Sequence, residues 1–442
     1  MLKSFADIFK VEDLKNRVLV TIGIIAVYRL GAFIPLPLVN ADALKSLFQA
    51  HSRSLLGFMD MFSGGALSQL SIFSLGIMPY INASIIMSLV QGSHIFPYLE
   101  RLSKEGESGR KKINQITRYF TVLLATVQAF GLSIAITKMP VPGGGSIVVD
   151  PSVRWTLLAV VTLVTGTLFV MWLGEQITEF GIGNGISLII FAGIIDRFPG
   201  AIKDVFRLLK LEEISILTVL VMTAVVLVVV GLVVWLETAQ RRIPVQYAKR
   251  IVGRKMYGGA STFLPLKVEQ SGVIAVIFAV SLLSMPMTVT QFFPTAVWAQ
   301  RFGDIWNRGG LVYEIVFGSL IIFFCYFYNS VAFNPSDIAE NLKKSGGFIQ
   351  GIRPGEHTAN YISRIVERIT LGGALGVVAI AILPDYMRKI FNAPFFFGGT
   401  SLLIVVGVAL DTIGQIESRL IMRHYEGFMK QGRIKGRWFN VR

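Results

Sequence analysis

The chain has few of the residues from which catalytic and metal sites are usually built. Among its 442 residues there are one cysteine and four histidines. The single cysteine, Cys325, excludes an internal disulfide and a metal site with several thiolate ligands. The histidines, at positions 51, 94, 357 and 424, stand in four separate segments and form no HExxH pair. We therefore expect no catalytic residue, no bound metal and no cofactor.

The sequence also lacks a P-loop, because no Gly-Lys dipeptide occurs in it. We therefore expect no ATP hydrolysis by this chain, and any energy must come from a partner or a gradient. The run GIGNG at residues 181–185 could cradle a phosphate, but no strand precedes it and an apolar stretch follows. A flexible entry into a helix is the favoured interpretation.

One tetrapeptide, Gly106-Glu107-Ser108-Gly109, matches the GxSG pattern of intramembrane serine proteases. It lies in a segment crowded with lysine and arginine, which is typical of a solvated loop. The protease interpretation fails on the missing histidine and on the position of the serine.

Charged residues make up only 16% of the chain and hydrophobic residues 53%, a composition that is rare among soluble enzymes. About 20 apolar residues, at about 1.5 Å each, match a hydrocarbon core of about 30 Å. The sequence therefore predicts ten membrane-spanning helices. They lie near residues 18–38, 70–96, 116–137, 155–174, 182–199, 214–236, 271–293, 311–333, 369–384 and 396–416.

Lysine and arginine are distributed unevenly between the two sides of these spans. With ten spans, both termini share one side with the segments near 97–118, 175–181, 237–270 and 334–368, and that side holds 29 of the 42 basic residues. Basic residues are retained in the cytoplasm, so both termini are expected to be cytoplasmic. Three acidic residues before the first apolar run, and no small-residue cleavage site, argue against a removable signal peptide.

The segment at about 58–69 is apolar enough to enter the membrane and too short to cross it. Adjacent glycines at 64 and 65 make it a poor helix, and non-helical backbone at membrane depth requires protein or a water-filled cavity around it. Two interpretations stay open here, a re-entrant element beside a cavity and a surface loop at the interface. Arg29 and Asp411, isolated charges within the spans, are expected to pair with neighbouring groups or to reach the interface.

Several long strings resemble the bacterial SecY family, in order and over essentially the whole chain. They are FSGGALS (62–68), GIMPYINASII (76–86), EGESGRKKINQITRY (105–119), TGTLFVMWLGEQITE (165–179), GIGNGISLIIFAGI (181–194), LKKSGGFIQGIRPGE (342–356) and FFGGTSLLIVV (396–406). The chain departs from the family pattern at Phe180, where a basic residue is common, and at Ala275, where a proline is common.

The resemblance implies an all-α membrane protein with ten transmembrane helices in two pseudo-symmetric five-helix halves around a central pore. The halves would be residues 1–205 and 206–420, followed by a basic cytoplasmic tail at 421–442. It further implies a short re-entrant plug helix at about 58–69, which moves aside during transport. The plug residues carried over are Phe58, Met61, Phe62, Ser63, Gly64, Gly65, Ala66, Leu67 and Ser68.

Isoleucines four residues apart share one helical face, and by spacing alone they would be ordinary lipid-facing residues. The resemblance changes this interpretation, because the family has a ring of aliphatic side chains at the waist of its pore. The ring residues carried over are Ile77, Ile81, Ile186, Ile190, Ile277 and Ile404.

Two basic cytoplasmic loops, at about 237–270 and 334–368, form a second functional surface. By composition they retain orientation and meet anionic lipid headgroups. The resemblance implies that they also receive the SecA motor ATPase or a translating ribosome, whose RNA phosphates suit lysine and arginine. The residues in question are Arg241, Arg242, Lys249, Arg250, Arg254, Lys255, Lys343, Lys344 and Arg353.

The function implied is a protein-conducting channel that passes unfolded secretory polypeptides and releases apolar segments sideways into lipid. It would lie in the bacterial cytoplasmic (inner) membrane with small SecE-type and SecG-type subunits, and its substrates would carry signal sequences. The alternative is a secondary carrier for small solutes, since such carriers also use interrupted helices and internal repeats. A carrier predicts ionisable residues converging near the midplane, and the sequence has few there.

Overall fold

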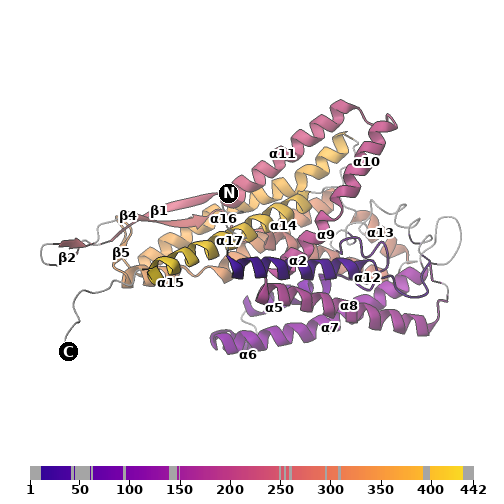
Figure 1. Ribbon diagram of the computed structural model, residues 1–442, viewed down its shortest axis with the longest axis horizontal. Helices are drawn as coiled ribbons and strands as arrows, with labels where there is room; N and C mark the ends of the chain where they lie inside the picture. The colour runs from indigo at the N-terminus through magenta and orange to yellow at the C-terminus, as the bar shows by residue number, and fades with distance from the viewer. Residues whose placement is uncertain are drawn as a thin grey trace.

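The computed structural model describes residues 11–40, 44, 60, 63–92, 96–138, 147–148, 150–247, 250–252, 255–257, 261–293, 296–306, 310–391 and 399–431. Helices dominate it, with bounds α2 Glu12–Ala32, α5 Met78–Gly92, α6 Pro97–Lys104, α7 Glu107–Lys138, α8 Val153–Phe180, α9 Gly185–Ile195, α10 Phe198–Lys210, α11 Ile216–Thr238, α12 Val273–Gln291, α13 Val297–Ile305, α14 Leu311–Ala332, α15 Pro335–Lys344, α16 Glu356–Phe391 and α17 Gly399–Gln431. Most of the long helices run along one axis of the molecule (Figure 1).

Seven helical stretches in the described part of the chain are long and apolar enough to cross a bilayer. They contain α7, α8, α9 with α10, α11, α14, α16 and α17, which confirms seven of the ten predicted spans by length and composition. The other three predicted spans are helical as well. Of these, α2 has 21 residues and charged ends, α12 is apolar over Val273–Pro286, and α5 has only 15 residues.

The short α5 corrects the prediction of a helix from residue 70. Residues 63–77 form consecutive turns, apart from a single β-bridge between Ser71 and Pro35. Positive φ angles at Gly64, Gly65 and Leu70 interrupt any helix there. The short plug helix expected at 58–69 is therefore a run of turns over its described residues from 63 onward.

The helices pack in two groups that follow the chain. In the first, α7 packs on α5 and α8, and α8 on α2 and α9; in the second, α11, α12, α14, α16 and α17 pack on one another. Contacts between the groups are made by α12 with α5 and α7, and by α17 with α9. One large apolar core runs through both groups, and α10 connects them, so the predicted boundary at 205/206 falls inside this helix.

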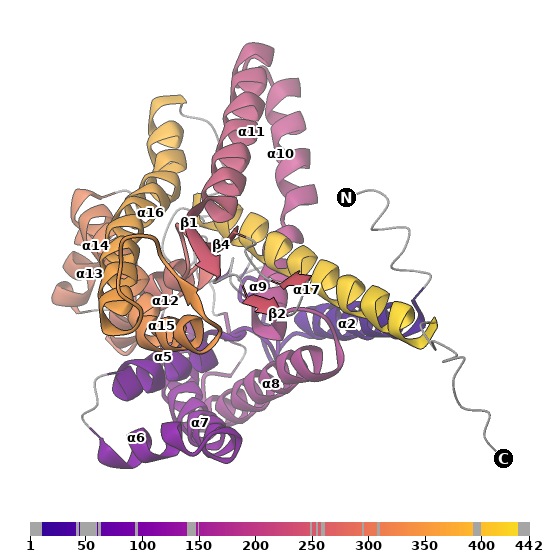
Figure 2. The ribbon, with the colours of Figure 1, turned by 90° about the vertical axis from the view of Figure 1, so that its left-hand side faces the viewer.

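The segment 237–270 contains strands that the sequence reading did not foresee. β1 (Gln240–Tyr247) pairs antiparallel with β4 (Ser261–Lys267), and β2 (Arg250–Val252) with β3 (Lys255–Tyr257). β5 (Gly347–Phe348) joins the other edge of β1 through the pairs Gln246 with Phe348 and Tyr247 with Gly347. The sheet extends from one end of the helical body (Figure 1), and it lies in front of the helices when that end faces the viewer (Figure 2).

The start of α2 and the later part of α17 lie together at one end of the molecule. Leu14 packs in a small cluster with Leu420, and the Gly183 amide just before α9 donates to the Gln415 side chain at 3.1 Å. The sheet lies at this end and α10 towards the other (Figure 1). The start of α2 and the end of α17 thus lie at the same end as the sheet, and the cytoplasmic placement of the termini stays a prediction.

Candidate pore and plug

The six isoleucines assigned to the pore ring lie in one continuous apolar core. Ile77 and Ile81 come from the turn before α5 and from its start, Ile186 and Ile190 from α9, Ile277 from α12 and Ile404 from α17. Five of them have 5% or less of their surface exposed, and Ile186 is partly buried against the same core. Elements from both helical groups therefore contribute to one aliphatic centre.

An aliphatic centre of this kind can act as a seal. Apolar side chains offer water and ions no partner, so a constriction lined by them excludes both by dewetting. They also carry no charge that would hold a passing polypeptide. Ala275, at the position where the family commonly has proline, is buried in the first turn of α12, and the helix runs on through Ile277.

The segment assigned to the plug is mostly buried where it is described, with Gln69 exposed at its end. Ser63, Gly64, Ala66 and Leu67 are buried, and Gly65 and Ser68 are intermediate; Phe58, Met61 and Phe62 lie outside the described residues. A surface loop at the membrane interface would leave these side chains exposed, so that alternative is wrong for residues 63–68.

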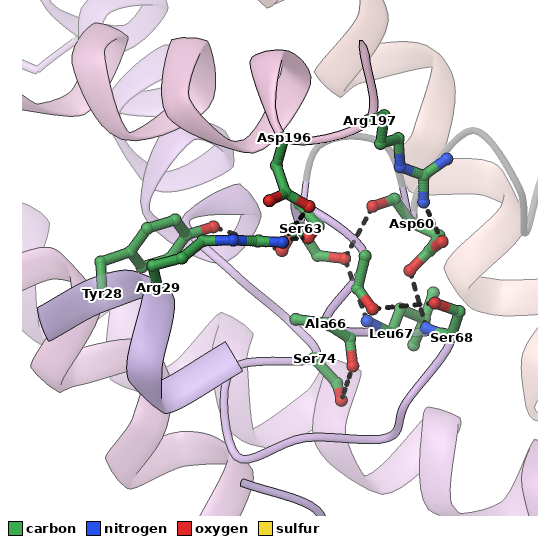
Figure 3. A network of polar contacts seen from close by, with 12 residues as sticks. Tyr28, Arg29, Asp60, Ser63, Ala66, Leu67, Ser68, Ser74, Asp196 and Arg197 are labelled. Atoms are coloured by element: carbon green, nitrogen blue, oxygen red, sulfur yellow. Dashed lines mark hydrogen bonds and ion pairs between the residues drawn. The ribbon is translucent and has the colours of Figure 1, made fainter. Parts of the chain in front are cut away.

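Two residues of α2 hold the backbone of the plug segment (Figure 3). The Tyr28 hydroxyl donates to the carbonyl of Ser63 at 3.2 Å, and an Arg29 amino group donates to the carbonyl of Gly64 at 2.7 Å. Arg29 also forms an ion pair with Asp196, the residue that follows α9. The prediction that Arg29 pairs with neighbouring groups is thereby confirmed. Asp411 lies exposed on α17, and its place at the membrane interface stays a prediction.

Asp60 connects the plug segment to the beginning of α10. One carboxylate oxygen forms an ion pair with Arg197, and the other accepts a hydrogen bond from the Ser68 amide at 2.7 Å. Asp60 has 4% of its surface exposed, and a buried carboxylate needs such partners. The Asp60 side chain therefore connects the turns of the plug segment, through Ser68, to the start of α10, through Arg197.

Hydrogen bonds from serine side chains stabilise the turns of the plug segment. The Ser63 hydroxyl accepts from the Leu67 amide at 3.1 Å and donates to the carbonyl of Asp60 at 3.0 Å. The Ser74 hydroxyl donates to the carbonyl of Ala66 at 3.1 Å. Serines therefore satisfy backbone groups that a helix would have paired internally.

The two motifs for which enzyme chemistry was considered have structural roles or none. Asn184 caps α9, since its side-chain oxygen accepts from the amides of Ile186 and Ser187 at 3.1 and 3.3 Å. Residues 181–185 are thus a helix entry, as expected. Ser108 lies exposed in the first turn of α7.

The two basic loops meet in the three-stranded sheet, because β5 of the second loop pairs with β1 of the first. Ile243, Val245 and Leu266 of the hairpin pack with Ile349 and Ile362 in an apolar cluster. The sheet is therefore anchored on α16.

The described basic side chains of this surface are exposed, namely Arg241, Arg242, Lys343, Lys344 and Arg353. Lys344 also pairs with Glu340, one helical turn before it, at 2.9 Å. Arg250 and Lys255 lie in β2 and β3, and Lys249 and Arg254 lie outside the described residues. The structure thus brings two separate basic segments onto one surface.

Glu269, between β4 and α12, is a buried acid that the sequence reading missed. Its carboxylate accepts from the Ser271 amide at 3.1 Å and from the Ser271 hydroxyl, and the Cys325 thiol lies 3.8 Å from one oxygen. Burial raises the pKa of Glu269 above its usual value, although the bonds from Ser271 lower it in part.

The sequence reading also missed Asp60, Asp196 and Arg197. The last two form a charged dipeptide directly after the apolar run of α9, where a partner on another segment could have been sought. Their partners lie more than 130 positions away, so only the tertiary structure identifies the pairs.

Comparison of the sequence with known proteins identifies the family of this chain. The family model described as SecY matches residues 71–413. The chain is 46% identical over 427 residues to the protein translocase subunit SecY of Escherichia coli, covering 96% of both chains. This chain belongs to the SecY family. The membership agrees with the resemblance seen in the motifs, and nothing in these matches favours a carrier of small solutes.

Solved structures with the SecY fold superpose on nearly the whole chain. One, described as showing that the SecY plug domain stabilises the closed state of the translocation channel and maintains a membrane seal, has a TM-score of 0.64 at 17% identity and covers 95% of each chain. Another, Sec61 in the canine ribosome–channel complex from the endoplasmic reticulum, has a TM-score of 0.60 at 16% identity with the same coverage. The all-α membrane channel fold is therefore that of SecY and Sec61.

Proposed function

We propose that this chain is the channel-forming subunit of a protein translocase, which passes unfolded secretory polypeptides across the membrane. The observation that carries the proposal is the gathering of six isoleucines, from four elements in both helical groups, in one buried apolar core. In a SecY-family protein this core is the waist of the pore. Its side chains seal the resting channel and close around a polypeptide in transit.

The plug segment lies against the last turn of α9, the helix that carries two of these isoleucines. It closes the resting channel and moves aside when a polypeptide enters. Support comes from its burial and from the similar structure in which the plug domain is described as stabilising the closed state.

Apolar segments of a substrate leave the channel sideways into lipid, between the two halves. The contact between α5 and α12, one helix from each group, is the seam that opens. Partitioning of an apolar helix into the bilayer supplies the driving force for this exit. The halves comprise residues 1–205 and 206–420, with the basic tail at 421–442.

The exposed basic surface formed by the two cytoplasmic loops receives the SecA motor ATPase or a translating ribosome. The chain has no P-loop of its own, so ATP hydrolysis belongs to the motor. A ribosome partner is supported by the similar Sec61 structure from a ribosome–channel complex. Small SecE-type and SecG-type subunits complete the assembly in the bacterial inner membrane, with both termini cytoplasmic.

The test is protection of a secretory precursor from external protease, in liposomes containing this chain with its SecE-type partner, SecA and ATP. We expect protection that requires both ATP and this chain. An intact complex that protects no precursor would contradict the proposal, and uptake of small solutes would be measured next.

A further inference from the structure

The two residues that join α9 to α10 form ion pairs of opposite polarity with two different segments. Asp196 pairs with Arg29 of α2, and its neighbour Arg197 pairs with Asp60 of the plug segment (Figure 3). Arg29 in turn donates to the carbonyl of Gly64 in the plug segment. Adjacent residues at one helix junction are therefore connected to the plug segment by two separate routes.

The backbones also touch at this junction. A Cβ atom added to Gly64 would lie 2.9 Å from the Cα of Gly193, and one added to Gly193 would lie 3.1 Å from the Cα of Gly64. Gly193 precedes Asp196 by three residues, so it lies on the same face of the helix end. The plug segment therefore rests directly on the part of α9 that ends in the charged dipeptide.

The junction is also the place where the two helical groups are connected. α10 is the chain link between α9 of the first group and α11 of the second, and Ala201 is its one buried residue among Phe198–Lys210. With so little packing to hold it, α10 can reorient when the groups separate. Asp196 and Arg197 would then move with the junction, away from partners fixed on other segments.

We propose that Asp196 and Arg197 are positioning residues that latch the plug segment to the connection between the halves, so that separation of the halves releases the plug. This inference rests on the proposed channel function. Asp60 is buried, and leaving its carboxylate without Arg197 is unfavourable, so the closed arrangement is favoured while the pair is intact. The strength of the pair thereby sets how readily a substrate opens the channel.

The test compares single and paired charge changes in the complete complex in liposomes. The variants are Asp60→Lys, Arg197→Glu and the double exchange Asp60→Lys/Arg197→Glu, with Lys203→Glu, an exposed cation of the same helix, as the matched control. Two quantities are measured. The first is the resting ion conductance, and the second is the concentration of a synthetic signal peptide that gives half-maximal labelling of Leu67→Cys, a buried plug position, in a Cys325→Ser background.

We expect each single change to raise resting conductance and to lower the half-maximal peptide concentration, because a state that is easier to open needs less ligand to populate it. The double exchange should return both quantities towards those of the unmodified complex, and Lys203→Glu should leave them unchanged. Equal values for the singles and the unmodified complex, or a double exchange that is at least as leaky as the singles, would overturn the latch.

Precursor protection by the unmodified complex is recorded in the same liposomes. Its loss would count against the channel function itself, whereas normal protection without recovery in the double exchange would count only against the latch. Thermal unfolding of the purified variants identifies any that fail to fold. The reciprocal pair, Arg29→Glu with Asp196→Arg, is the second set, and a double exchange that fails to recover there would overturn the role of Asp196 in the same way.

Discussion

At the scale of single residues, an isoleucine and a leucine of similar size can have opposite roles in this chain. Ile190 on α9 is fully buried in the core shared by the two groups, whereas Leu220 on α11 has 63% of its surface exposed. Removing the first side chain opens the apolar centre, and removing the second changes only the surface that faces lipid. Burial, and not residue type, separates the two.

We therefore expect Ile81→Gly and Ile190→Gly, singly and together, to raise the resting ion conductance of the reconstituted complex. Each change removes a buried aliphatic side chain, which in soluble cores costs about 2–5 kcal/mol for truncation to alanine. Leu220→Gly is the control, because it introduces the same helix-weakening glycine, worth about 1 kcal/mol, outside the core. An unchanged leak in the double variant would count heavily against the ring.

Glu269 gives a second prediction at this scale, for the dependence of stability on pH. Its pKa is raised in the folded chain by burial, so the folded state favours the protonated acid. The favourable contribution is complete below the usual pKa of 4.5 and is lost as the pH rises through the raised value.

Glu269→Gln should therefore stabilise the protein above the raised pKa relative to the parent, and have little effect at pH 4.5. Its amide oxygen can still accept from Ser271. The measurement is thermal melting of the detergent-solubilised complex from pH 4.5 upwards. A variant that is less stable than the parent at every pH would contradict the raised pKa of Glu269.

At the scale of elements, the sequence predicts helices better than strands in this chain. Long apolar runs identify α7, α8, α11 and α14 directly, because a span must satisfy its backbone within itself. The hairpin of β1 and β4 carries no such signal, since its strands contain two prolines, Pro244 and Pro265, and several charges. Its strands are stabilised by packing on α16 and by pairing with β5, and both partners are distant in sequence.

The joined sheet makes a specific prediction for its exposed basic residues. Arg353→Glu should impair SecA-driven transport of a precursor while leaving membrane insertion of the complex intact, because it reverses an exposed charge on the surface proposed to receive the motor. The control is Lys210→Glu, which reverses an exposed charge at the end of α10. Normal transport by Arg353→Glu would remove it from the binding surface.

At the scale of the whole molecule, the distribution of basic residues predicts which ends of the helices share a side. The structure brings the start of α2, the end of α17 and the sheet to one end. The polar contacts of the plug segment could not be predicted in this way. They depend on side chains of opposite charge that meet only when α2, the turns at 63–77 and the end of α9 are packed together.

Single cysteines introduced into a Cys325→Ser background test the orientation. We expect Arg241→Cys to react with a membrane-impermeant thiol reagent only from the cytoplasmic side, and Lys203→Cys only from the opposite side. Both side chains are exposed, and their elements, β1 and α10, extend towards different ends of the molecule (Figure 1). The parent should be unreactive because Cys325 is buried. Labelling of both positions from the same side would refute the ten-span topology.

The pairing of β5 with β1 has a mechanical consequence. Both strands belong to the second helical group, and the hairpin packs on α16 of that same group. In the proposed docking, a motor or ribosome that binds this sheet would contact the second helical group alone. A push from that partner would then act on one half of the molecule and turn it relative to the other at the contact between α5 and α12.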